Sequence, residues 1–451
     1  MRYTDIAIIG GGLAGSTAAA MLGRAGISTV LIDPHESYPT DFRVEKLSGQ
    51  EQVGRFLKTG IAESVLRRAT FTGENWIARF GRLLDKAPSR QFNILYDSLV
   101  NAVRDEIPAS VERICAKAIA VETSEERQRV VLSNDETISA RLVVLANGLN
   151  VGLRHQLGIA RKVISACHSI SIGFDIVPVG RSAFAFPALT YFSERPSDRI
   201  PYITLFPVGT RMRANLFVYR ACDDPWLREL RRAPTETLDA ALPRLEAVTG
   251  PFEIPGEIKI RPVDLYVNDC RGQPGLVLVA DAFATSCPVA GTGCDKVFTD
   301  VERLCNVHIP AWLACDGMSA AKIAAFYADP VKRACDEWSA AKAFDFPLSL
   351  DRYEPLLDGA ALGPLHRLVG SRPAAAAWRR LRAGAELARS FLLVVLVLGI
   401  LEVVFVLIVP AVVGVSRRAV RLMDLVVPQL AIGPVLGEQL GMRAALDRPA
   451  P

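Results

Sequence analysis

The chain has 451 residues, of which half are apolar and 22% are charged, and its formal net charge is +4. These values indicate a globular protein and give no support for a nucleic-acid-binding surface. Nine cysteines contain no C-x-x-C pair, so we expect free thiols rather than a zinc site, another metal site or a disulfide framework. The N-terminus shows no signal peptide, which favours a cytoplasmic catalytic part.

Residues 5–33 predict a βαβ unit. The segment 5–9 is typical of a buried strand, 16–25 of an alanine-rich helix, and 27–32 of the next strand. Between the first strand and the helix, residues 10–15 read Gly-Gly-Gly-Leu-Ala-Gly and fit the pattern G-x-G-x-x-G. This spacing is typical of a dinucleotide-binding turn.

Each glycine of this turn has a separate physical role. Gly10 permits the tight bend, Gly12 leaves room for a pyrophosphate, and Gly15 lets the helix pack closely on the strand. At the start of the helix, Leu13 and Ala14 are expected to offer backbone N–H groups to the phosphates. These five residues are therefore predicted to bind a cofactor.

Asp33 ends the second strand, where a carboxylate accepts hydrogen bonds from ribose hydroxyls. Its charge disfavours a 2′-phosphate at the same place. A tight turn without a ligand is the alternative interpretation. The motif by itself does not separate FAD from NAD.

The segment 275–304 favours FAD. A buried strand ends at Asp281, and a glycine-rich stretch then opens a helix. Asp281 is predicted to bind the ribityl chain, and the backbone N–H groups near 291–293 to face the flavin ring. The predicted flavin-binding residues of this segment are Asp281, Pro288, Gly291, Thr292 and Gly293.

On these motifs, residues 3–345 resemble the para-hydroxybenzoate-hydroxylase-like flavoprotein monooxygenases and the related flavin-dependent halogenases. The resemblance implies one FAD surrounded by three motifs, with Arg43 touching the cofactor. Two positions depart from the family pattern: Ala280 replaces a glycine, and Asn147 replaces an aspartate before Gly148. The lost carboxylate leaves open whether NAD(P)H reduces the flavin directly or through a partner flavin reductase.

The predicted fold class is α/β: a Rossmann-like FAD-binding domain with an inserted β-sheet substrate domain and a C-terminal apolar helix. Residues 50–110 show helical spacing, residues 111–145 predict a small β meander, and residues after 164 alternate as strands. The predicted divisions are an FAD-binding domain over 1–163 and 271–345, a substrate domain over 164–270, a helical linker over 346–390, a membrane-spanning helix over 391–415, and a tail over 416–451.

Several polar residues are candidates for chemistry near the flavin. Glu45 and Lys46 follow Arg43 directly, and a lysine there can orient a substrate or bind an oxygen intermediate. Both residues are also compatible with an ordinary surface position. His168 is a weaker candidate for a base, because an isolated histidine is more often structural.

Residues 391–415 form the most apolar stretch, with twenty of their 25 residues Leu, Ile, Val or Phe. As a helix this stretch would measure about 37 Å, longer than a hydrocarbon core of about 30 Å. Glu402 opposes insertion, but the apolar residues outweigh it. We expect a membrane anchor, with a buried helix as the alternative.

Together these patterns predict an FAD-dependent monooxygenase that hydroxylates an apolar or aromatic small molecule through a flavin hydroperoxide. One alternative is a flavin-dependent reductase or dehydrogenase of a lipid-like substrate. A halogenase is disfavoured because no two tryptophans have the W-x-W spacing. A non-catalytic, membrane-tethered flavin-binding partner is the last alternative.

Overall fold

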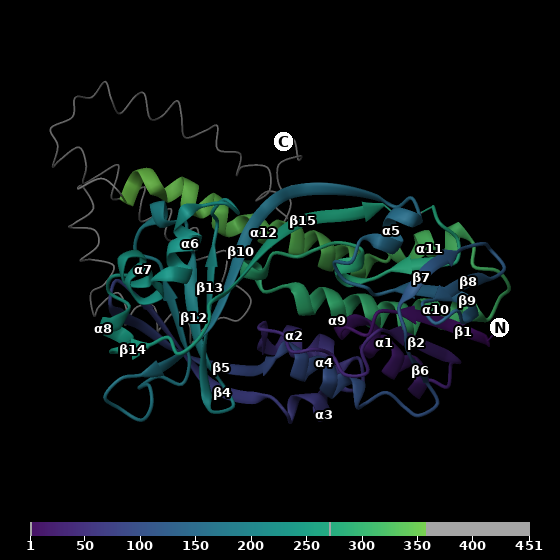
Figure 1. Cartoon of the computed structure of the whole chain (residues 1–451), viewed down its shortest axis with the longest axis horizontal. Coiled ribbons are helices and arrows are strands. Elements are labelled where there is room, and N and C mark those ends of the chain that lie inside the picture. Colours follow the sequence, from purple (N-terminus) through teal and green to yellow (C-terminus); the bar gives the residue numbers. More distant parts are fainter. Residues whose placement is uncertain (1, 270–271, 358–451) are drawn as a thin grey trace, which may run out of the picture. The chain divides into compact units, whose positions relative to one another are not determined.

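The computed structural model describes residues 2–269 and 272–357. The predicted anchor 391–415 and the tail after it lie outside the described residues, as does most of the predicted linker. All described residues belong to one compact unit, which is organised around two β-sheets (Figure 1). Within the described ranges, no helix combines the length and apolarity that crossing a membrane requires.

The first sheet contains the predicted Rossmann-like unit. Its seven strands follow the order β6-β2-β1-β9-β8-β7, with β16 beside β9. The strands are β1 (Arg2–Ile9), β2 (Thr29–Asp33), β6 (Glu112–Cys115), β7 (Ala118–Glu122), β8 (Gln128–Leu132), β9 (Thr137–Leu145) and β16 (Leu276–Leu278). Strands β6, β2, β1, β9 and β16 pair in parallel, whereas β7, β8 and β9 form the predicted meander. Strand β16 thus brings the late motif beside the opening one.

Helices surround this sheet. Helix α1 begins after Gly12, whose backbone is extended, and Gly26 adopts a positive φ of 73° just after its end. The helices are α1 (Leu13–Arg24), α2 (Gly49–Leu57), α3 (Ala62–Leu66), α4 (Tyr96–Arg104), α5 (Gly152–Gln156), α9 (Gly293–Arg303), α10 (Ile309–Leu313), α11 (Ala320–Tyr327) and α12 (Pro330–Leu357). A continuous apolar core joins the strands to α1 and to the residues after α9.

The second sheet has nine strands in the order β14-β10-β13-β12-β11-β4-β5-β3, with β15 beside β10. They are β3 (Val44–Ser48), β4 (Thr70–Arg79), β5 (Arg82–Leu95), β10 (Ala160–Pro178), β11 (Leu189–Phe192), β12 (Tyr202–Val208), β13 (Arg211–Val218), β14 (Phe252–Glu253) and β15 (Lys259–Asp269). The predicted hairpin turn lies at 209–210, between β12 and β13. Helices α6 (Pro225–Arg232), α7 (Pro234–Ala241) and α8 (Glu246–Thr249) belong to the same region, and α6 and α7 bury their leucines against the sheet's apolar core. Figure 1 shows β10 and β15 as a long ribbon that runs from this sheet towards the first.

The expectation of helices over 50–110 was correct for α2, α3 and α4 but wrong for the segment between α3 and α4. Residues 70–95 form the antiparallel pair β4 and β5, and β4 also pairs with β11. Cross-strand pairing with distant residues overrides the local helical spacing here. The second sheet therefore includes strands from before residue 164 as well as from the predicted substrate domain.

The expectation of free thiols was wrong for two cysteines. Cys167 and Cys222 form a disulfide, with their Cα atoms 6.2 Å apart and a sequence separation of 55. An irregular stretch of β10 brings Cys167 beside the loop after β13. The pairing depends on this tertiary contact, so the spacing of the cysteines could not reveal it.

Candidate active site

The turn between β1 and α1 has room for side chains on one side only. A Cβ at Gly15 would lie 1.8 Å from the carbonyl oxygen of Gly10, and Gly10 itself has a φ of 105°. A Cβ at Gly12 would meet only the hydroxyl of Tyr96, at 3.9 Å. Gly15 therefore serves the packing of the helix, whereas Gly12 faces open space.

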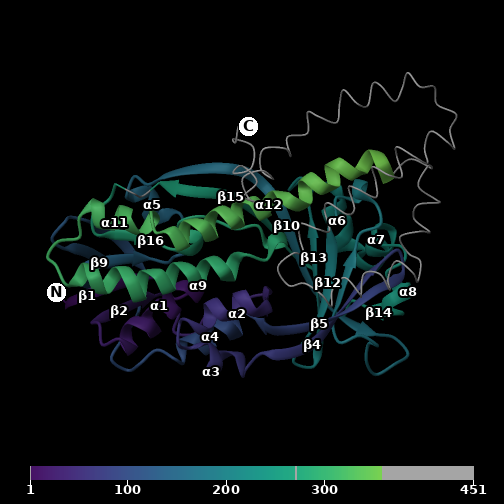
Figure 2. The ribbon, with the colours of Figure 1, turned by 180° about the vertical axis from the view of Figure 1, so that it is seen from behind.

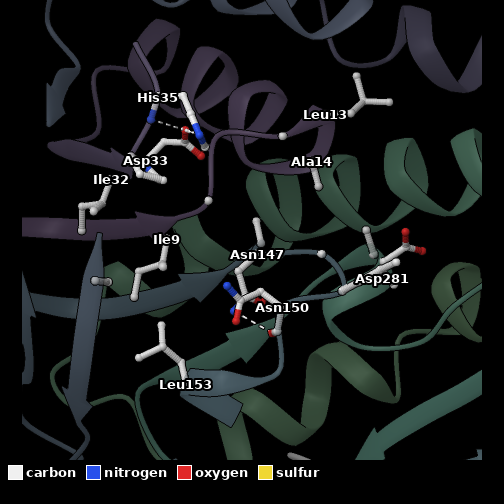
Figure 3. A pocket seen from close by; sticks show the side chains of 18 of the residues that line it. Ile9, Leu13, Ala14, Ile32, Asp33, His35, Asn147, Asn150, Leu153 and Asp281 are labelled. Carbon is white, nitrogen blue, oxygen red and sulfur yellow. Dashed lines mark hydrogen bonds and ion pairs between the residues drawn. The ribbon is translucent and has the colours of Figure 1, made fainter. Parts of the chain in front are cut away.

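That open space is a cavity of about 540 Å³ at the carboxyl ends of β1 and β9 (Figure 3). Seven of the predicted cofactor-binding residues line it: Gly10, Gly12, Leu13, Ala14, Asp33, Arg43 and Asp281. Three segments far apart in the sequence thus converge on one cavity. Ligands of open parallel sheets bind at this edge.

Asp33 is tied into the turn as well as facing the cavity. One carboxylate oxygen accepts the backbone N–H of Gly11 at 2.7 Å, and the other accepts that of His35 at 2.9 Å. Arg104 approaches the same carboxylate at 3.1 Å and donates to the carbonyl oxygen of Gly11. Asp33 therefore shapes the turn in addition to its predicted contact with a ribose.

Sequence reasoning missed Arg104. Its side chain is 3% exposed and holds the carbonyl oxygens of Gly11 and His35 from the end of α4. An arginine among the buried residues Leu99, Val100 and Val103 of one helix was the available signal.

A second cavity of about 220 Å³ adjoins the first, and the two share Leu13, Arg43, Tyr96, Leu149, Arg261, Asp281 and Val297. Strands β10, β13 and β15 of the second sheet wall this smaller cavity with Ile172, Phe217 and Val263. Its opposite side is formed by the late motif. Arg261 lines both cavities. It was missed in the sequence because no motif lies in β15.

The late motif lines the smaller cavity through Pro288, Gly291 and Gly293. The side-chain amide of Gln52, on α2, donates to the carbonyl oxygen of Gly291 at 3.2 Å, which fixes the loop. Thr292 lines neither cavity, because its buried hydroxyl hydrogen-bonds with Ser339 of α12 at 2.6 Å. Its predicted role is thus limited to its backbone.

Arg43 lies where the two cavities meet. Its guanidinium binds the carboxylate of Asp41 through two nitrogens, at 3.0 and 2.6 Å. It also lies over the ring of Tyr96, 3.8 Å from the centroid. This double contact holds a permanent positive charge beside the predicted cofactor path.

Glu45 and Lys46 both line the smaller cavity. The ammonium group of Lys46 donates to the hydroxyl of Thr204 at 3.1 Å and has no carboxylate partner among the described residues. Burial lowers the pKa of Lys46 to about 8, although Glu45 opposes the shift. Burial raises the pKa of Glu45, whose carboxyl oxygen accepts the thiol of Cys294 at 3.4 Å.

His168 lies away from both cavities. Its ring nitrogens contact the hydroxyl of Ser165 and the carbonyl oxygen of Ala343. Burial lowers the pKa of His168, so the ring is neutral near pH 7. His168 therefore has a structural role: it connects β10, on which it lies, to α12.

The middle motif also reaches the larger cavity. The side-chain nitrogen of Asn147 donates to the carbonyl oxygen of Asn150, while its buried side-chain oxygen has no partner in the described part of the chain. Arg154 is 1% exposed and donates to the carbonyl oxygens of Gly148 and Ala282. Arg154 therefore joins the middle motif to the late one.

Ala280 precedes Asp281 with a φ of 52°, in the left-handed region. This conformation costs about 1–2 kcal/mol for a residue with a Cβ. The replacement of the family glycine is therefore a strained substitution next to a residue of the cavity.

The donor set fits FAD. A bare helix N-terminus suits a pyrophosphate, and two carboxylates suit the hydroxyls of a ribose and a ribityl chain. The smaller cavity continues from that groove past Asp281 towards the glycine-rich loop. Gly12, Asp33, Arg43 and Asp281 would hold the cofactor.

A model of the FAD binding domain family matches residues 3–307. The 3-demethoxyubiquinol 3-hydroxylase of Escherichia coli is 27% identical over 338 residues, which cover 68% of this chain and 80% of the relative. Aklavinone 12-hydroxylase DnrF of Streptomyces peucetius subsp. caesius is 24% identical over 329 residues, 64% of each chain. The crystal structure of PqsL from P. aeruginosa with 2-aminobenzoylacetate has a similar fold, with a TM-score of 0.60, 21% identity, and coverage of 79% of this chain and 100% of PqsL.

The chain therefore belongs to the FAD binding domain family. Within it, the chain is an FAD-dependent monooxygenase of the para-hydroxybenzoate hydroxylase type, as the three sequence motifs predicted.

Gly12→Val tests which glycine serves the cofactor. We expect the apoprotein to fold with a nearly unchanged melting temperature, because a Cβ at Gly12 meets no close neighbour. FAD affinity should fall at least about 100-fold, because the branched side chain occupies the phosphate space. Fluorescence titration of FAD into the apoprotein measures the loss.

Gly15→Ala is the matched control, since its methyl group would clash with the carbonyl oxygen of Gly10. This variant should lose stability as well as FAD. A Gly12→Val protein that retains its yellow colour through purification would contradict the assignment.

Proposed function

We propose that the enzyme hydroxylates an apolar aromatic small molecule bound in the smaller cavity. The observation that carries this proposal is the position of that cavity, between the apolar wall of the second sheet and the glycine-rich loop of the FAD groove. Both curated relatives described above are named as hydroxylases, and the first is named for a quinol. These names support hydroxylation of an aromatic ring here.

Bound FAD supplies the redox chemistry by which a reduced flavin activates oxygen. The chain's own residues contribute position and shelter. Phe217, Val263 and Ile172 hold an apolar ring and exclude water from one side. Polar groups at the same cavity, foremost Lys46, act on a substrate hydroxyl.

Oxygen consumption in the presence of candidate substrates tests the proposed reaction. We would screen phenols, quinols and aromatic amines with the reduced holoenzyme, and analyse products by mass spectrometry with ¹⁸O₂. A product heavier by one labelled oxygen supports hydroxylation. Turnover that reduces a double bond without taking up label would instead favour a dehydrogenase or reductase.

The reductant is a separate part of the proposal. We propose that NAD(P)H is the electron source, either directly or through a flavin reductase. Asn147 in the middle motif favours the indirect route, because the family carboxylate is missing. Anaerobic mixing of holoenzyme with NADH or NADPH distinguishes the two, since direct use bleaches the bound FAD without added reductase.

Lys46 is proposed to accept a proton from the substrate hydroxyl at its side-chain nitrogen. With a pKa of about 8, only about one tenth of the amine is neutral at pH 7, and half is neutral at pH 8. The neutral form can accept a proton, so the rate should increase with pH through this range. Glu45 lies beside it, and burial raises the pKa of this carboxyl.

Lys46→Met should slow hydroxylation by about 100-fold and remove the rise in kcat around pH 8. A pH profile of oxygen consumption coupled to product measures both effects. Glu45→Gln is the control: it leaves the amine of Lys46 in place, so the rise with pH should persist. A Lys46→Met enzyme that keeps the wild-type rate and pH profile would contradict the proposed role of Lys46 as a proton acceptor.

We further propose that residues 391–415 attach the enzyme to a membrane, with the catalytic part in the cytoplasm. The composition of this stretch supports the proposal. A membrane location would also suit an apolar substrate, because such compounds concentrate in bilayers.

Val395→Arg with Leu398→Arg should release the full chain from the membrane fraction, because two charges in the centre of the stretch oppose insertion by about 5–7 kcal/mol. Sedimentation of cell lysates measures the distribution. Glu402→Ala removes the one acidic residue of the stretch and should stay with the membrane. A wild-type chain found entirely in the supernatant would contradict the anchor.

A further inference from the structure

The Ala280–Asp281 turn carries a cofactor-site carboxylate on a strained backbone. Ala280 has its positive φ immediately before Asp281, which lines both cavities. A strained residue persists only where its surroundings enforce it. The contacts that enforce this turn are therefore of functional interest.

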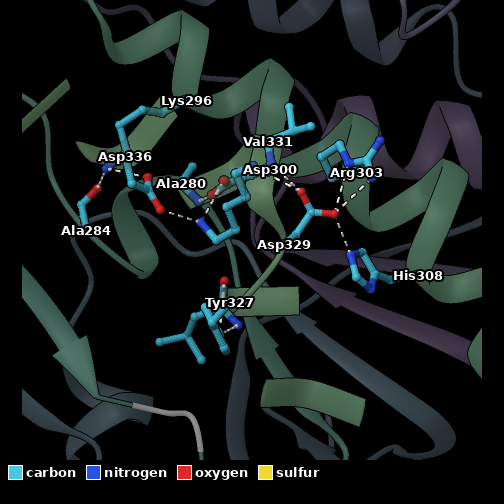
Figure 4. A network of polar contacts seen from close by, with 12 residues as sticks. Ala280, Ala284, Lys296, Asp300, Arg303, His308, Tyr327, Asp329, Val331 and Asp336 are labelled. Carbon is cyan, nitrogen blue, oxygen red and sulfur yellow. Dashed lines mark hydrogen bonds and ion pairs between the residues drawn. The ribbon is translucent and has the colours of Figure 1, made fainter. Parts of the chain in front are cut away.

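The side chain of Asp300, on α9, binds the backbone amide of Ala280. One oxygen of its carboxylate accepts the Ala280 N–H at 2.8 Å (Figure 4). The side chain of Asp300 is 1% exposed and lines neither cavity. A buried carboxylate in such a place requires a compensating partner.

Lys332, on α12, is that partner. Its ammonium group donates to the other oxygen of Asp300 at 2.7 Å and to Asp336 at 3.0 Å. Burial would lower the pKa of Lys332, but the two carboxylates outweigh it and raise the pKa. The amine therefore remains charged, beneath the rings of Phe283 and Phe326.

The residues on either side of the turn have other attachments. Tyr327 hydrogen-bonds with the backbone of Leu278, in the strand before the turn. Arg154 and Asn268 donate to the carbonyl oxygen of Ala282, after it. The amide of Ala280 depends on Asp300, and Asp300 depends on Lys332.

We propose that the Lys332–Asp300 ion pair is a positioning device for the flavin site, which enforces the left-handed conformation of Ala280 and so presents Asp281 to the cofactor. Lys332 is a positioning residue, because it acts through Asp300 and touches neither cavity. The inference depends on FAD binding and is independent of the substrate.

Lys332→Met, measured in two backgrounds, tests the device. In the wild-type background we expect FAD affinity to fall at least about tenfold, and the visible circular dichroism of bound FAD to change. In the Ala280→Gly background the loss should shrink to about threefold or less, because glycine adopts a positive φ without enforcement. Fluorescence titration well below the melting temperature measures affinity.

Lys332→Gln is measured in the same two backgrounds. Because glutamine keeps a donor to Asp300, its loss of FAD affinity should be smaller, and this loss should again shrink when Ala280 is replaced by glycine. Lys342→Met removes an exposed ion pair with Asp345 from the same helix and should leave FAD affinity unchanged. Melting temperatures of the apoproteins record any general loss of stability.

The proposal is overturned if the Lys332 variants that fold bind FAD with wild-type affinity and dichroism while only their melting temperatures fall. It is equally overturned if the loss of affinity is the same with alanine and with glycine at position 280. If Lys332→Met fails to fold in either background, the FAD affinities of Lys332→Gln with alanine and with glycine at position 280 provide the same test.

Discussion

The close approach of α1 to the end of β1 is the constraint on which the site depends. At Gly15 the carbonyl oxygen of Gly10 occupies the place of a side chain, so the helix starts against bare backbone. This contact turns the first N–H groups of the helix towards the cavity. Asp33 and Arg104 then fasten the turn through Gly11. Residues of the middle and late motifs line the same cavity.

Local patterns made the βαβ unit and the late motif predictable. A glycine turn and a strand-end acid are tied to nearby sequence, and the structure places Asp33, Arg43 and Asp281 on one cavity. Strands β4 and β5 were not predictable from their spacing. They pair with each other, but their places in the sheet also depend on β3 beside β5 and on β11 beside β4, and β11 lies more than a hundred residues later in the sequence. Arg104 and Arg261 were missed for a related reason: each acts on a segment remote in sequence. No motif marks Arg261, and the signal at Arg104 was only a charge among the apolar residues of one helix.

Two lysines show how burial alone does not decide the behaviour of a charged group. Lys46 faces the smaller cavity with a hydroxyl partner, and its pKa falls to about 8. Lys332 is more deeply buried, yet two carboxylates raise its pKa. The first amine is therefore suited to exchanging a proton, and the second to holding a backbone in place. The difference lies in their partners and is invisible in the sequence.

The ribbon of β10 and β15 has a mechanical consequence. Its ladder of hydrogen bonds continues between the two sheets, with its irregular register between Val163 and Ser169. That same stretch is fastened by the Cys167 disulfide and by the contact of His168 with α12, which passes in front of β10 in the view of Figure 2. The irregular stretch of the ribbon is thus held in place. Swinging the two sheets apart at this stretch would first require breaking the disulfide of Cys167 and the contact of His168 with α12.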